Sequence, residues 1–67
     1  MRLLTYEALT ERGIPYSRMH LRRLERAGRF PQHIALTVRP DGHPGRIAWA
    51  EPEIDAWVEE RSAARAA

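Results

Sequence analysis

The sequence predicts a mainly α-helical fold with a small β-hairpin, and three observations support this prediction. Two short helical patterns, each preceded by a hydroxyl residue suited to capping and followed by a glycine, are separated by only a few residues. A segment rich in β-forming residues comes next and is interrupted by proline, aspartate and glycine. The last part of the chain has the periodicity of a longer helix. Helix, short turn, helix, hairpin and helix, in this order, are the layout of a winged helix-turn-helix.

The first helix is predicted over residues 6–12. Thr5 is a suitable N-cap, and Gly13 is a natural C-terminal stop because glycine adopts the left-handed conformation that ends many helices. Tyr6 and Leu9 lie three residues apart, so they share one face of this helix. We expect that face to point inward.

The second helix is predicted over residues 18–27. Ser17 is its N-cap and Gly28 its stop, after a short connection from the first helix. Leu21 and Leu24 are also three residues apart and form a small apolar stripe. The helix is therefore amphipathic, with one narrow buried side.

Charged and polar side chains cover the rest of this second helix. Three arginines at a spacing of four form a ridge opposite the stripe: Arg18, Arg22 and Arg26. The ridge is flanked by Met19, Arg23 and Glu25, and we expect Glu25 to be solvated. His20 lies beside the apolar stripe, which favours a packed or hydrogen-bonded histidine over one that reads a base.

The hairpin is predicted from two β-forming stretches, "HIALTV" at 33–38 and "RIAW" at 46–49, which flank the turn-forming sequence "RPDGHPG". The connection is longer than a two-residue turn, so we expect a flexible tip. Before the hairpin, Phe30 and Pro31 interrupt the helical pattern, and the phenyl ring is predicted to enter the core.

The last helix begins near Pro52, a residue that favours the first helical position, and has acidic residues in its first turn. Ile54, Trp57 and Val58 follow helical spacing and are predicted to form its buried stripe. Trp49 and Trp57 are expected to anchor the hairpin to the helices, because large aromatic side chains contribute most to small cores.

Length and composition limit the kind of protein. A chain of 67 residues with 43% apolar content can form one small core, so residues 1–67 are predicted to be a single winged helix-turn-helix domain. The absence of cysteine excludes disulfides and thiolate metal sites. No apolar run is long enough to span a membrane, and the N-terminus does not have the pattern of a signal peptide. We expect a cytoplasmic protein.

Charge is distributed unevenly along the chain. Residues 1–49 hold nine arginines against four acids, a net of +5, whereas residues 50–67 hold two arginines against five acids, a net of −3. Every basic residue apart from histidine is arginine, which forms bidentate bonds to phosphate and guanine. Codon bias in a GC-rich genome is an equal explanation for the missing lysine, so the placement of the charge is the stronger argument for nucleic acid.

Three stretches, "LLTYEALTERGI", "SRMHLRRLERAGRFPQHIAL" and "RIAWAEPEIDAWVEERSAAR", resemble the AlpA-type prophage regulators and small phage excisionases. These belong to the MerR-like winged helix-turn-helix superfamily, and the resemblance covers about residues 3–65. It implies binding to short, often repeated DNA sites. It also implies either transcription control of phage or integrative-element genes, or control of recombination direction through an integrase. The connection "GIPYS" and the wing "TVRPDGHPGR" are longer than in many relatives.

The candidate DNA-binding residues lie on the second predicted helix and on the predicted hairpin. Helix 18–27 is expected in the major groove, with Arg18 and Arg22 at base edges and Met19 near a thymine methyl group. The wing, residues 38–47, is expected on the backbone or in the minor groove. The complete set is Ser17, Arg18, Met19, Arg22, Arg23, Arg26, Arg39 and Arg46. Arg23 and Arg26 are assigned to phosphates, Ser17 to the capped helix N-terminus, and the alternative for all of them is a solvated surface.

The sequence gives little support for other classes of function. No catalytic constellation or glycine-rich phosphate loop is present, and the three histidines lack zinc spacing, so we expect no enzyme, no cofactor and no metal site. The expected partners are double-stranded DNA, an integrase, and further copies of the chain bound cooperatively on repeated sites at the nucleoid. The alternative is a protein-interaction module, an adaptor or antitoxin, whose arginines meet an acidic partner. The DNA sequence, the oligomeric state and the bend angle stay open.

Overall fold

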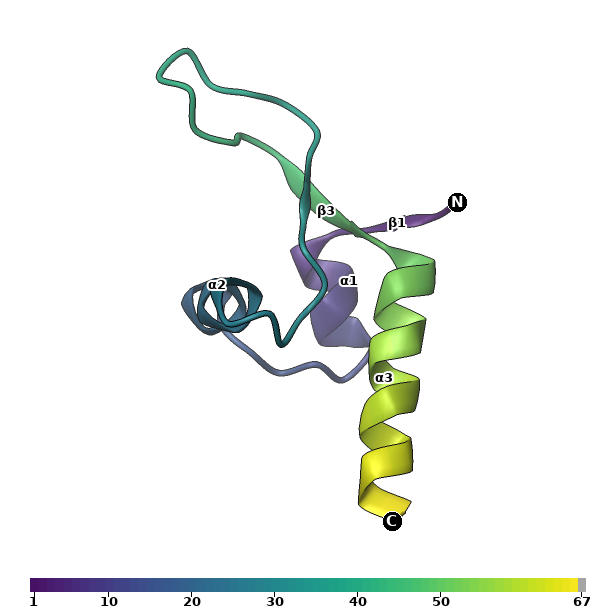
Figure 1. The fold of residues 1–67 in the computed structure, drawn as a ribbon. Helices are drawn as coiled ribbons and strands as arrows, with labels where there is room; N and C mark the ends of the chain where they lie inside the picture. Colours follow the sequence, from purple (N-terminus) through teal and green to yellow (C-terminus); the bar gives the residue numbers. More distant parts are fainter. Residues whose placement is uncertain (67) are drawn as a thin grey trace.

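A computed structural model describes residues 1–66 and shows a mainly helical chain with a small antiparallel sheet (Figure 1). The elements in chain order are β1 (Leu3–Leu4), α1 (Tyr6–Glu11), α2 (Arg18–Arg26), β2 (Ile34–Ala35), β3 (Ile47–Ala50) and α3 (Glu51–Ala66). This arrangement confirms the winged helix-turn-helix predicted from the sequence. The hairpin and α3 extend in opposite directions, so the molecule is elongated, with extents of 47 × 25 × 17 Å.

The first two helices begin and end where their caps predict. The Thr5 hydroxyl accepts a hydrogen bond from the Ala8 amide, and the Ser17 hydroxyl accepts one from the His20 amide, both at 3.1 Å. Each helix is followed by a glycine with positive φ, 93° at Gly13 and 72° at Gly28. Both helices end one residue earlier than expected, which is the usual uncertainty of a helix terminus.

The sheet has the order β1-β3-β2. β1 pairs with β3 through Leu3↔Ala50 and Leu4↔Trp49, and β2 pairs with β3 through Ile34↔Ala48. Strand β1 was missed by the sequence analysis, because two residues are too few to show alternation. The strand β2 is also much shorter than the predicted 33–38.

Beyond these strands the hairpin arms continue without regular pairing. The amides of Leu36 and Thr37 both donate to the carbonyl of Arg46, at 2.7 and 3.4 Å, which is the pattern of a β-bulge. At the tip, Gly42 donates to the carbonyl of Arg39 at 2.9 Å, and the Arg39 amide donates to the carbonyl of His43 at 2.7 Å. The tip is therefore a hydrogen-bonded turn with a glycine at positive φ.

The core lies between the sheet and the three helices. Its buried members are Leu4, Leu9, Ile14, Leu21, Phe30, Trp49 and Ile54. Phe30 enters this core as predicted and packs edge-on against Trp57, with ring centroids 4.9 Å apart. The Trp57 indole N–H donates to the Arg29 carbonyl at 2.8 Å, so α3 holds the segment after α2. Val58 was expected in the buried stripe but is exposed.

Candidate nucleic-acid interface

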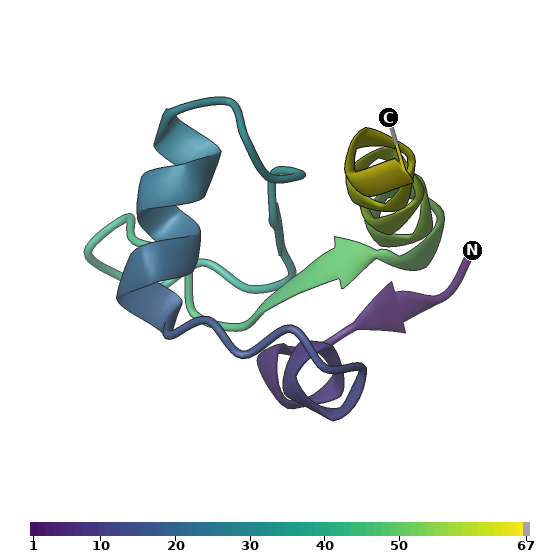
Figure 2. The same ribbon diagram turned by 90° about the horizontal axis from the view of Figure 1, so that it is seen from below.

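Helix α2 and the tip of the hairpin lie on the same side of the molecule, away from α3, in two perpendicular views (Figures 1 and 2). The candidate residues on these two elements are all exposed: Ser17, Arg18, Met19, Arg22, Arg23, Arg26, Arg39 and Arg46. The structure thus brings together residues that are up to 29 positions apart in the sequence, from 17 to 46. The hairpin extends from the sheet on the side of the molecule where α2 lies, and its tip stands apart from α2 in Figure 1.

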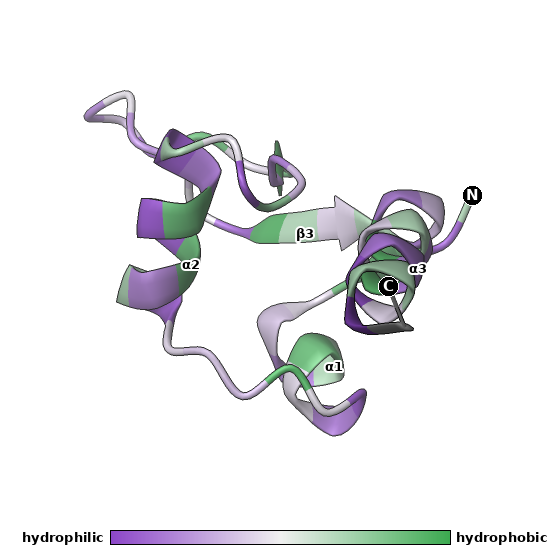
Figure 3. Cartoon of the chain, turned by 60° about the horizontal axis from the view of Figure 1, so that its bottom comes forward, coloured by the Kyte–Doolittle hydropathy of each residue, from purple (hydrophilic) through white to green (hydrophobic). Residues whose placement is uncertain are grey.

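The buried side of α2 is rotated relative to the sequence-based expectation. Leu21 and Glu25 are buried, while Leu24 is only half-buried. At about 100° per residue, the side opposite the buried pair carries Met19, Arg23 and Arg26. Figure 3 shows the hydrophobic part of α2 turned toward β3 and the hydrophilic part turned outward.

Two expectations about this helix were therefore wrong. Glu25 was expected to be solvated, but it is 6% exposed because it lies one turn after Leu21 on the inner side. His20 was expected beside the core, but it is exposed and lies against Tyr16, with ring centroids 4.7 Å apart. The arginines of the ridge are exposed, yet the middle of the outward side of α2 lies nearer Arg23 than Arg22.

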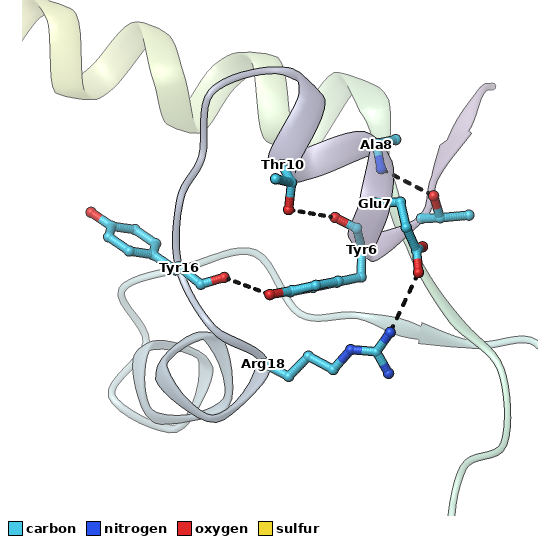
Figure 4. A network of polar contacts seen from close by, with 7 residues as sticks. Tyr6, Glu7, Ala8, Thr10, Tyr16 and Arg18 are labelled. Atoms are coloured by element: carbon cyan, nitrogen blue, oxygen red, sulfur yellow. Dashed lines mark hydrogen bonds and ion pairs between the residues drawn. The ribbon is translucent and has the colours of Figure 1, made fainter.

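Arg18 is held at the edge of this surface by residues of α1 (Figure 4). Its guanidinium lies 4.6 Å from the centroid of the Tyr6 ring and 3.5 Å from a carboxylate oxygen of Glu7. The Tyr6 hydroxyl donates to the carbonyl of Tyr16 at 3.1 Å and so fixes the turn before α2. The Arg18 side chain is still 69% exposed, so its guanidinium is both oriented and accessible.

The sequence analysis did not assign Tyr6 and Glu7 to the site. Both side chains belong to the first helix, and nothing in their spacing indicates contact with Arg18, which lies beyond the turn. Only the angle between the two helices brings them together.

The remaining arginines of α2 are less constrained. Among residues 1–66, no hydrogen bond or ion pair involves the guanidinium of Arg22 or Arg26. Arg23 contacts the sulfur of Met19 at 3.9 Å, one turn away, and Met19 is itself 66% exposed. These guanidinium groups are therefore free to form new bonds without breaking strong ones.

On the hairpin, Arg39 and Arg46 stand on opposite arms. The Arg39 guanidinium lies 3.5 Å from a carboxylate oxygen of Asp41 at the tip, and His43 lies 3.3 Å from the other oxygen. The backbone amide of Arg46 donates to the hydroxyl of Thr37 at 2.8 Å, which joins the two arms. Asp41 reduces the positive charge of the tip, and the sequence analysis gave it no role in the site.

Arg12 contributes to folding rather than to this surface. It lies at the C-terminal end of α1 and forms ion pairs with Glu51 and with Asp55, the latter at 2.7 Å. These acids lie near the start of α3, where negative charge also favours the helix dipole. The pairs connect α1 to α3 on the far side from the hairpin tip.

Two further findings apply to the part of the chain that the structure describes. Within it, no cluster of three or more histidine, aspartate or glutamate residues has the geometry to hold a metal ion. None of its helices combines the length and apolar character that crossing a bilayer requires.

Comparison with known proteins identifies a family for this chain. Residues 7–62 match the family described as the prophage CP4-57 regulatory protein (AlpA). No curated protein matches the chain. The matched region includes both helices of the helix-turn-helix, the hairpin and most of α3. The family is one of phage-type regulators and not of enzymes, and it confirms the resemblance to AlpA-type regulators noted in the sequence. The chain belongs to the AlpA family of prophage regulatory proteins.

Proposed function

We propose that the protein is a sequence-specific regulator that binds double-stranded DNA through α2 and the hairpin. The observation that supports this most directly is the gathering of six exposed arginines on one side of the molecule: Arg18, Arg22, Arg23, Arg26, Arg39 and Arg46. Helix 18–27 enters the major groove, and the wing, residues 38–47, lies on the backbone or in the minor groove. No catalytic step is involved.

The individual roles follow from position and from existing contacts. Arg22 has an unengaged guanidinium, and Arg18 has one oriented by Tyr6, so both suit bidentate bonds to guanine. Met19 lies on the outermost line of α2 and suits a thymine methyl group. Arg23 lies on the same line, which makes it a third candidate for a base edge in addition to its role at phosphate.

Phosphate contacts are assigned to the edges of the surface. Arg26 lies in the last turn of α2, and Arg39 and Arg46 lie on the hairpin arms, where they reach the backbone or minor groove. Ser17 keeps its hydroxyl in the cap, so the free amides of the first turn of α2 are its contribution to phosphate binding.

Two alternative biological processes are compatible with this proposal. In one, the protein is an AlpA-like transcription regulator at a promoter; in the other, it is an excisionase that directs an integrase, as in the MerR-like excisionases that the sequence resembles. Both act on the DNA of a bacterial cytoplasm. They are separated by where the selected sites lie, beside a promoter or within an attachment site.

We also propose that copies of the chain associate on neighbouring sites. The edge strand β2 and the arm that follows it carry three exposed apolar side chains, Ile34, Leu36 and Val38, the last of them 69% exposed. A surface of this kind favours protein contact. Binding to duplexes with one and with two adjacent sites tests this, and equal affinity per site would argue against cooperative association.

The central test is a gel shift with random duplex at low and high salt, followed by in vitro selection of bound sequences. We expect binding at low salt, weakening with salt, and recovery of a short motif. Failure to shift any duplex at low salt would contradict the DNA-binding proposal. It would favour the second candidate, a protein-interaction module that uses Ile34, Leu36 and Val38 together with the arginine surface.

A further inference from the structure

Glu25, in the last turn of α2, is the one charged side chain that is buried in the described part of the chain. A buried carboxylate is costly unless hydrogen bonds compensate for its lost hydration. Here His33 supplies them: its Nδ1 donates to a carboxylate oxygen at 2.7 Å, and its backbone amide approaches the same oxygen at 3.4 Å. The carbonyl oxygen of Glu25 accepts two more bonds, from the Gly28 amide at 3.1 Å and from Gln32 Nε2 at 2.8 Å.

The three bonds from His33 and Gln32 connect the end of α2 to the base of the hairpin, while the bond from Gly28 closes the helix end. His33 directly precedes β2, so whatever fixes His33 also fixes Ile34, the first residue of the strand that leads into the wing. The other side of its ring faces Trp49 of β3 edge-on, with centroids 6.4 Å apart, and Trp49 is fully buried. His33 is therefore held between the proposed recognition helix and the central strand of the sheet.

Apolar contacts alone fix such an arrangement poorly, because they have no preferred direction. A buried hydrogen-bonded pair has a defined length and angle, and it can select one packing over others of similar energy. The sequence gives Glu25 no obvious function in DNA binding, since a carboxylate repels phosphate.

We propose that Glu25 and His33 are positioning residues that set the direction of the hairpin relative to α2, so that both elements reach one duplex. This inference rests on the DNA-binding function proposed above. The pair touches no DNA itself, and its effect on affinity passes through the wing arginines, Arg39 and Arg46.

The test is a double-mutant cycle on duplex affinity. The double variant Glu25→Leu/His33→Leu replaces the polar pair by apolar side chains, a change that usually preserves stability. We expect an unchanged or higher melting temperature together with affinity about tenfold weaker than in the wild type. In the background Arg39→Ala/Arg46→Ala, the same change should weaken binding by less than about twofold, since no wing contact is left to position.

Two further variants complete the design. His33→Asn keeps an N–H donor close to the place of Nδ1 and should restore most of the affinity, whereas His33→Leu alone should not. Glu11→Gln removes an exposed negative charge from α1 and controls for the change in net charge. If the double variant does not fold, Glu25→Leu alone, which leaves no buried carboxylate and only the half-buried His33, is taken through the same cycle.

Equal losses of affinity in the two backgrounds would overturn the inference, because the pair would then act on the fold as a whole. Full affinity of the double variant, or full affinity after loss of both wing arginines, would overturn it as well. If the wild-type chain binds no duplex, the proposed function itself is wrong, and this outcome is distinct from the others.

Discussion

The arginines on the proposed DNA surface differ in the contacts that their guanidinium groups already make within the protein. Arg18 is oriented by an aromatic ring and a carboxylate of α1, and Arg39 lies near an acid at the hairpin tip. Arg22 has no such contact within residues 1–66. A free guanidinium forms a base contact without first giving up another bond. Its removal is therefore expected to change DNA recognition with little effect on folding.

Arg22→Ala should relax base preference at one position of the selected motif, at a cost of about 1–3 kcal/mol in binding free energy. In vitro selection with the variant, together with titration of the wild-type motif, measures both effects. Arg65→Ala, on α3, removes the same charge away from the surface and should leave the motif unchanged. An unaltered motif for Arg22→Ala would remove Arg22 from the base-reading residues.

Asp41 is the acid nearest the wing arginines. Asp41→Asn should strengthen binding by about 0.5 kcal/mol, because it removes a charge that repels phosphate and attracts Arg39. The asparagine keeps the side-chain oxygen that accepts from the His43 amide at 3.0 Å, so the turn is preserved. Duplex titration measures the change, and Glu60→Gln on α3 is the control. Weaker binding would mean that the carboxylate orders Arg39 productively.

At the scale of elements, α2 depends on its caps as much as on its buried side. It has nine residues, and helices this short gain little from intrinsic propensity alone. Ser17 supplies an acceptor to the first turn, and Gly28 ends the helix with a φ of 72°. The start and end of α2 also define which arginines face outward.

Ser17→Ala should lower the free energy of unfolding by about 1 kcal/mol, since the His20 amide loses its partner. Denaturant unfolding followed by circular dichroism measures this. Ser62→Ala, within α3, is the matched control, and alanine there should be neutral or slightly stabilising. No loss of stability in Ser17→Ala would show that water replaces the cap at no cost.

The hairpin depends on close approach of its two arms at Gly45. A Cβ atom placed there would overlap the hydroxyl of Thr37, which itself accepts from the Arg46 amide. Gly45→Ala should therefore separate the arms and cost about 1–3 kcal/mol. Thermal unfolding and duplex titration measure the two consequences. Gly42 is no substitute as a control, because its φ of 88° penalises alanine for a different reason. Unchanged stability and affinity would mean that the arms separate at no cost.

Positive and negative side chains gather on opposite sides of the molecule as a whole. The arginines of α2 and the hairpin lie on one side, and α3 with its five acids lies on the other. Two of those acids share ion pairs with Arg12, and Glu53, Glu59 and Glu60 lie on the same helix, away from the proposed DNA surface. This distribution orients the protein toward a polyanion even though the net charge is only +2.

The salt dependence of binding tests this polarity. If four or five arginines neutralise phosphates, the slope of log K against log salt concentration should be about −4. Arg26→Ala should reduce the magnitude of the slope by about 1 and weaken binding equally on all sequences. Fluorescence anisotropy across a salt series measures both. A slope near zero would contradict a phosphate-based interface.

Sequence reasoning was most successful where structure is local. The caps, the glycine stops, the inward ring of Phe30 and the order of the elements all depend on neighbouring residues, so the sequence contains them. It was least successful where two distant residues meet. The pairing of β1 with β3, the hydrogen bonds at the hairpin tip and the burial of Glu25 depend on contacts across the fold.

The sequence by itself determined that this chain is a winged helix-turn-helix of the AlpA family with an arginine-covered second helix. Only the tertiary structure decided which side of that helix faces outward. With Leu21, Leu24 and Glu25 all available to the core, periodicity allows more than one rotation of α2. In the observed rotation the carboxylate of Glu25 has His33 as its hydrogen-bond partner, and this bond compensates for the hydration that the carboxylate loses on burial.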